Sequence, residues 1–146
     1  MSTSVKHGLV VACVSVLLCS CGPKGPPRKE TFPVTGIVYV DGQPAADLAI
    51  DCISLGEVDK TTPSHSQATT DKDGKFAFDT YQKSDGVPAG EYVLTFLWGK
   101  LNLMTMSYGG PDKLKGRYSD PKKSEHKFTV EKGKQTPPLE IKLTTK

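Results

Sequence analysis

The amino-acid sequence predicts an all-β protein, a single antiparallel β-sandwich of about seven strands. Three observations lead to this prediction. Between residues 33 and 143, short runs of β-branched and aromatic residues alternate with polar ones. Turn signals rich in Gly, Pro and Asp-Gly separate these runs. No long stretch has apolar residues at the 3.6-residue spacing of an amphipathic helix.

The first element along the chain is a short apolar run over residues 8–18, interrupted by Ser15 alone. At about eleven residues it is too short to cross a bilayer as a helix, which takes roughly 20. It has the length of the apolar region of an export signal, ~7–15 residues, and Lys6 supplies the positive charge ahead of it. We therefore expect residues 1–20 to be a signal peptide.

The end of this run, "LCSC", places Leu18 three residues before Cys21, with the small Ser20 directly ahead of that cysteine. The pattern resembles the lipobox of bacterial lipoproteins, in which a diacylglycerol is attached to the cysteine thiol and the chain is cut just before it. The resemblance implies that Cys21 is the lipidated first residue of an exported protein, anchored to a bacterial membrane with its domain on the extracytoplasmic side. A cleaved soluble protein and an uncleaved membrane stub are the alternatives, and Gly22 favours the outer membrane over the inner only weakly.

A Pro- and Gly-rich basic segment follows, and we assign residues 21–30 to the lipidated cysteine and a tether. "GPKGPPRK" favours an extended, semi-rigid chain of about 3.1 Å per residue, enough to hold a domain on the order of 25 Å from the membrane. Its cations, Lys24, Arg28 and Lys29, belong either to a solvated spacer or to a contact with anionic head groups.

The charge balance does not indicate a nucleic-acid-binding protein, and the cysteine content does not indicate a disulfide-bonded one. The chain has 19 Lys and Arg against 16 Asp and Glu, and removal of the signal takes away only Lys6, so nucleic acid is not an expected partner. Cys13 and Cys19 are discarded with the signal, which leaves Cys52 as the one free thiol and allows no internal disulfide. Its apolar neighbours in "LAIDCISL" predict a buried strand position and not a reactive site.

The strands follow in order over residues 31–146, which we expect to form one domain. Two alternating runs flank the Asp-Gly at 41–42 and suggest a paired unit, and two short strands flank "DKDG" at 71–74. Residues 88–98 form a strand with apolar side chains on both faces, and the last two strands lie in "HKFTVEKG" and "LEIKL". The side chains expected to point inward are Phe76, Phe78, Phe128, Val130, Leu139, Ile141 and Leu143.

Three of these stretches, "VTGIVYVDGQPAADLAIDC", "ATTDKDGKFAF" and "DGVPAGEYVLTF", resemble the carboxypeptidase regulatory-like, transthyretin-like domains of small bacterial lipoproteins. The resemblance covers residues 33–144 and implies a prealbumin-like sandwich that serves as an accessory or adhesive module. One enzyme branch of that fold, the hydroxyisourate hydrolases, ends in Tyr-Arg-Gly-Ser, whereas this chain ends in "KLTTK". That hydrolase activity is therefore not expected.

The candidate chemical groups favour structural roles. Asp71, Asp73 and Gly74 imitate the start of a calcium loop, but the acid needed about 12 residues along is missing, so we predict a tight turn. His65 and His126 are too few for a metal site and are expected at the surface. No nucleophile elbow, zinc motif or phosphate loop occurs, and we expect no cofactor, no metal and no catalysis.

The segment 99–124 is the most open question, because irregular connections of this length often carry function. Its candidates for contact with a ligand or partner are Tyr108, Lys113, Arg117 and Tyr118. Aromatic and cationic groups together suit a sugar ring or an envelope protein. The alternative is that the segment closes a sheet edge, with Leu103 and Met104 packed and a tip near Gly109 exposed.

The sequence as a whole predicts a non-catalytic envelope lipoprotein with a structural or accessory β-sandwich. A carbohydrate- or peptidoglycan-binding module that uses the 99–124 segment is the first alternative, and a small transthyretin-fold hydrolase is a more distant one.

Overall fold

The computed structural model describes residues 25–57, 59–102, 104–105 and 107–146, and every regular element in these ranges is a β-strand. The predicted signal and Cys21 lie outside the described residues. The strands are β1 (Thr31–Phe32), β2 (Thr35–Val40), β3 (Gln43–Pro44), β4 (Ala49–Ser54), β5 (Ser66–Thr69), β6 (Lys75–Ala77), β7 (Val87–Pro88), β8 (Gly90–Leu97), β9 (Lys100–Asn102), β10 (Ser107–Gly109), β11 (Lys127–Val130) and β12 (Leu139–Leu143). The all-β prediction is confirmed for this part of the chain.

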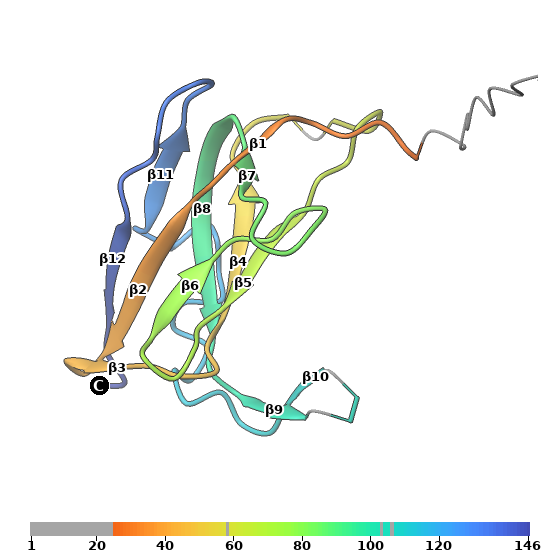
Figure 1. Cartoon of the computed structure of the whole chain (residues 1–146). Coiled ribbons are helices and arrows are strands. Elements are labelled where there is room, and N and C mark those ends of the chain that lie inside the picture. The colour runs from red at the N-terminus through yellow and green to blue at the C-terminus, as the bar shows by residue number, and fades with distance from the viewer. Residues whose placement is uncertain (1–24, 58, 103, 106) are drawn as a thin grey trace, which may run out of the picture.

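Two larger sheets form the body of the domain (Figure 1). One has the order β11-β8-β4-β5 and is antiparallel throughout. The other has the order β12-β2-β3, and β6 also pairs with β2. In this second sheet β12 runs parallel to β2, from the pair Leu139–Gly36 to the pair Leu143–Val40. The expectation of a purely antiparallel sandwich was wrong at this pair, because the last strand joins β2 from a distant part of the sequence.

A single hydrophobic core joins the two sheets. The alternation along β2, β4 and β12 turns every second side chain inward. Phe76 and Phe78 lie in the core with their ring centroids 5.3 Å apart and their rings edge to face. Among the residues predicted to point inward, Val130, Ile141 and Leu143 are buried, and the side chains of Phe128 and Leu139 pack against the core while partly exposed.

Cys52 occupies the buried strand position that the sequence predicts. Only 4% of the residue is exposed, and burial raises the pKa of its thiol well above the ordinary value, with Asp51 adding to the shift. The thiolate form is therefore disfavoured, as expected for a cysteine that serves as a small apolar group.

Strand β8 is covered on both faces from Tyr92 to Phe96, as predicted, and Leu97 is exposed at its end. The Tyr92 hydroxyl donates a hydrogen bond of 2.9 Å to the carbonyl of Pro88. Burial raises the pKa of Tyr92 to about 12, with the neighbouring Cys52 adding to the shift, so the phenol stays protonated and can donate.

The two predicted turns form, but each lies next to a change of sheet. Asp41 and Gly42 both have positive φ, and their turn pairs β2 with the short β3, after which β4 crosses to the other sheet. At "DKDG", the Asp71 carboxylate accepts the N–H groups of Asp73 and Lys75 at 2.9 Å. The predicted tight turn is confirmed, whereas the strands on its two sides, β5 and β6, belong to different sheets.

The segment 99–124 is more regular than the sequence suggests. It begins with a hairpin in which β9 and β10 pair antiparallel. Figure 1 shows this hairpin at the end of the sandwich that also carries β3 and the C terminus, away from the end at which residues 25–30 enter. Met104 is 96% exposed, so the expected packing of this residue was wrong, and Leu103 lies outside the described residues. Over the described chain, no helix is long and apolar enough to span a membrane.

Candidate functional site

The four predicted contact residues lie in two parts of the 99–124 segment. Tyr108 lies in β10, where its backbone pairs with that of Leu101. The other three follow the hairpin, in a segment that returns to the body of the sandwich. Each of those three side chains contacts a group of the same chain, as the next paragraphs describe.

The segment is fixed where β8 ends, by the carboxylate of Asp112. One oxygen, Oδ1, accepts the N–H groups of Trp98 at 2.9 Å and of Leu114 at 3.0 Å. The other, Oδ2, accepts the N–H of Gly116 at 2.8 Å. Partial burial acts to raise the pKa of Asp112, but these three donors hold it below its ordinary value. The carboxylate is therefore a structural anchor that stays ionised.

Lys113 lies over the ring of Trp98, with its Nζ atom 4.2 Å from the ring centroid. The backbone N–H of Lys113 also donates to the carbonyl of Trp98 at 3.0 Å. The indole Nε1–H of Trp98 donates to the carbonyl of Ala46 at 2.9 Å. Lys113 thus makes a cation–π contact within the protein. Trp98, which lies under it, connects the segment to the loop before β4 through the hydrogen bond to Ala46.

Tyr118 is partly buried and packs edge to face on Phe96, with the ring centroids 6.2 Å apart. Its hydroxyl accepts the N–H of Thr144 at 3.1 Å. Arg117 donates from Nη1 to the carbonyl of the same Thr144 at 3.4 Å. Both residues thus hold the chain just beyond β12 to the segment that follows the hairpin.

The two histidines have different surroundings. His65 is exposed, as predicted, and its Nε2 lies 3.4 Å from Oδ1 of Asp51. His126 is only partly exposed, which differs from the expected surface position, because its ring packs edge to face on Phe96 at 5.2 Å and lies beside Tyr118. Burial lowers the pKa of His126, and the nearby charge of Glu125 partly opposes that shift.

Sequence reasoning missed the residues that hold this region together. Leu114 is fully buried, although its neighbours Lys113 and Lys115 are exposed. Asp112 and Trp98 received no role in the sequence interpretation. The one available signal was the Asp at the start of "DKLKG", since Asp side chains often accept N–H groups two to four residues further on.

A groove of about 950 Å³ lies elsewhere, between β4, β5, β6 and the loop after β6. Its wall carries carboxylates and amines together, among them Asp51, Asp79, Lys75 and Lys83. The one aromatic residue in its lining, Phe76, is buried, so the groove offers no exposed ring for stacking. Within the described ranges, no three His, Cys, Asp or Glu side chains gather closely enough to hold a metal ion.

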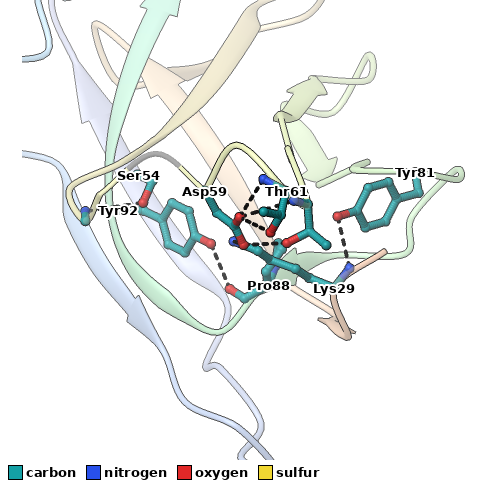
Figure 2. A network of polar contacts seen from close by, with 9 residues as sticks. Lys29, Ser54, Asp59, Thr61, Tyr81, Pro88 and Tyr92 are labelled. Carbon is teal, nitrogen blue, oxygen red and sulfur yellow. Dashed lines mark hydrogen bonds and ion pairs between the residues drawn. The ribbon is translucent and has the colours of Figure 1, made fainter. Parts of the chain in front are cut away.

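The end of the predicted tether contacts the domain, as Figure 2 shows for Lys29. The backbone N–H of Lys29 donates to the Tyr81 hydroxyl at 3.1 Å, and its Nζ lies 3.2 Å from Oδ2 of Asp59. The Arg28 guanidinium lies 5.4 Å from the centroid of the Tyr81 ring. Glu30 forms an ion pair of 3.4 Å with Lys132. We call this set of contacts, made by residues 28–30, the N-terminal clamp.

Comparison of the chain with protein-family models, with curated proteins and with solved structures found no match.

Proposed function

We propose that the chain is a non-catalytic bacterial lipoprotein, anchored by an acylated Cys21 and carrying a structural or accessory domain on the extracytoplasmic side of the membrane. The observation that carries this proposal is the "LCSC" pattern at the end of an apolar run of about eleven residues, followed at once by a Pro- and Gly-rich linker. Two or three acyl chains would hold the domain stably, whereas one chain binds a membrane only reversibly.

The contacts of the domain support a structural use of its most noticeable side chains. Lys113, Arg117 and Tyr118 each contact the body of the same chain. Asp85 and Asp112 are partly buried, but their carboxylates accept backbone N–H groups of their own loops, which lowers their pKa values. Carboxylates that accept backbone N–H groups in this way hold the conformation of a loop.

We further propose that the sandwich is of the prealbumin, transthyretin-like kind that the turn motifs resemble. The Asp-Gly turn after β2 and the "DKDG" turn before β6 both have the positive φ that these motifs require at Gly42 and Gly74. An experimental structure of residues 25–146, compared with known prealbumin-like domains, would test this part.

Mass spectrometry of the protein purified from bacterial membranes tests the anchor. We expect Cys21 at the N terminus, carrying acyl chains. Cys21→Ser should release the domain into the soluble fraction, and the matched control Cys19→Ser should leave it in the membrane. A mature protein that begins at another residue and lacks lipid would contradict the proposal.

A binding module remains a second candidate because the β9–β10 hairpin lies at one end of the sandwich and carries the fully exposed Met104 (Figure 1). If the hairpin region recognises envelope polysaccharide, Tyr108→Ala should weaken retention on peptidoglycan and leave stability unchanged. Retention that is absent in the unmodified protein would remove this candidate.

A further inference from the structure

We propose that the end of the sandwich that carries the N-terminal clamp faces the membrane, and that the β9–β10 hairpin end points away from it. The inference rests on the proposed anchor at Cys21. It adds an interaction surface, namely the clamp end against a lipid bilayer, which neither the lipobox nor the fold class specifies.

The clamp continues directly into the fold. After Glu30 the chain enters β1, whose residues Thr31 and Phe32 pair with Pro88 and Val87 of β7. Exposed ion pairs and cation–π contacts are individually weak. Here they form beside a strand that is already paired, so residues 28–30 lose little additional freedom when they bind. The tether therefore meets the domain at a fixed place.

The two loops that receive the clamp are organised by their own hydrogen bonds. Asp85 accepts the N–H groups of Thr80, Tyr81 and Gln82 at 2.7, 2.9 and 3.0 Å, and this fixes the backbone that presents the Tyr81 ring. Asp59 accepts the N–H groups of Thr61 and Thr62 at 2.9 and 3.2 Å, as part of the network in Figure 2. Both contact partners of Lys29 are thus held in position before the tether binds.

The clamp shortens the free tether. Only residues 22–27 remain between Cys21 and Arg28, and the seven steps from one residue to the other span about 22 Å as polyproline and at most about 25 Å when fully extended. Strand β8 has eight residues, about 26 Å at ~3.3 Å each. Because it leads from the clamp side toward the β9–β10 hairpin (Figure 1), the hairpin can reach the bilayer only if the whole domain tips over.

The charges of the clamp end fit this placement. Arg28 and Lys29 are directed at Tyr81 and Asp59 and not at lipid. The loop that carries Asp59 also has an exposed lysine, Lys60, which is suited to the phosphates of an anionic leaflet.

The test uses the full lipidated chain in vesicles of phosphatidylcholine and phosphatidylglycerol that contain an acceptor dye on the head groups. A donor dye is attached at Lys60→Cys, in the clamp end, or at Lys72→Cys, in the "DKDG" turn at the other end. Both are exposed lysines, and the buried Cys52 should not compete for the label. We expect energy transfer to be several-fold more efficient from position 60 than from position 72.

A second pair of variants tests the clamp itself. Tyr81→Ala removes both the ring under Arg28 and the acceptor for Lys29, and it should reduce the difference between the two labelled positions. Tyr81→Phe keeps the ring and should reduce it less. Equal transfer from positions 60 and 72 in vesicles that carry the protein would overturn the orientation alone. Failure of the unmodified protein to float with the vesicles would overturn the anchor, and the orientation with it.

Discussion

Tyr118 links the segment after the hairpin to the core by its ring and to the chain beyond β12 by its hydroxyl. Loss of a partly buried ring and its contacts typically costs about 1–3 kcal/mol. We expect Tyr118→Ala to lower the free energy of unfolding by that amount. Tyr118→Phe removes only the hydrogen bond to Thr144 and should cost roughly 0.5–1.5 kcal/mol. Urea denaturation of the two variants measures both effects.

The same variants separate the two interpretations of the segment. If Tyr118 has a structural role, replacing it should lower stability and leave envelope retention unchanged. Unchanged stability combined with reduced retention would contradict the structural role that the contacts of Tyr118 indicate.

His126 should make the fold sensitive to mild acid. Burial lowers its pKa in the folded protein, so the unfolded chain takes up the proton first as the pH falls through the ordinary value of about 6.5. In that window the unfolded state binds more protons, and stability decreases as the pH decreases, until the folded protein also becomes protonated. Denaturation midpoints between pH 8 and pH 5 should show this decrease.

The control for this pH effect is the other histidine. His126→Gln should flatten the dependence above pH 5, whereas His65→Gln, at an exposed position, should change it much less. An unchanged slope in His126→Gln would show that other groups cause the acid sensitivity.

At the scale of single elements, the "DKDG" turn depends on Gly74. Its φ is +74°, and a Cβ atom there would lie 2.7 Å from the carbonyl oxygen of Val38. Gly133 has a similar φ of +75°, but a Cβ at that position meets nothing within 4 Å. Gly133→Ala should therefore cost about 1 kcal/mol for the left-handed backbone alone. Gly74→Ala should cost clearly more, and equal thermal shifts would contradict the close contact.

Calcium provides a second test of the same turn. The Asp71 carboxylate is already occupied by two backbone N–H groups. We expect thermal melts with millimolar calcium and with chelator to coincide. A micromolar dissociation constant would instead stabilise the fold by a few kcal/mol at millimolar calcium.

The elements that could be predicted from the sequence are those specified by local pattern. Alternation specifies the buried face of a strand such as β12, and Asp-Gly specifies a turn such as that at Gly42. A turn signal does not say whether the next strand stays in the same sheet, and the strands on the two sides of "DKDG", β5 and β6, belong to different sheets. The parallel neighbour of β2 depends on a contact across most of the chain, which no local pattern encodes.

The candidate site was predicted less well for a related reason. Tyr118 was expected to form a hydrogen bond to the sandwich, and it does so. Leu114, between two lysines, gives no periodic signal, and its burial depends on the loop that Asp112 folds around it. Met104 looks like a packing residue by type, but it lies in the turn between β9 and β10 and is 96% exposed.

At the scale of the whole molecule, one core joins both sheets, and the domain should unfold in a single step. Trp98 is the one tryptophan of the chain, and it lies where the 99–124 segment leaves β8. Its fluorescence therefore reports on the segment, while far-ultraviolet circular dichroism reports on the strands. We expect the two signals to give the same urea midpoint within error. A lower midpoint for Trp98 would show that the segment detaches before the sandwich unfolds.

The parallel pairing of β2 with β12 also determines the order in which the protein can be built. The paired residues lie about a hundred positions apart, so closing this contact carries the entropy cost of a very long loop. As the chain is synthesised, β2 emerges early and β12 late. Until the final strand arrives, the edge of β2 that β12 will occupy has no neighbour and can join a strand of another chain. A chain exported as proposed should thus depend on chaperones on the extracytoplasmic side of the membrane until the last strand is delivered.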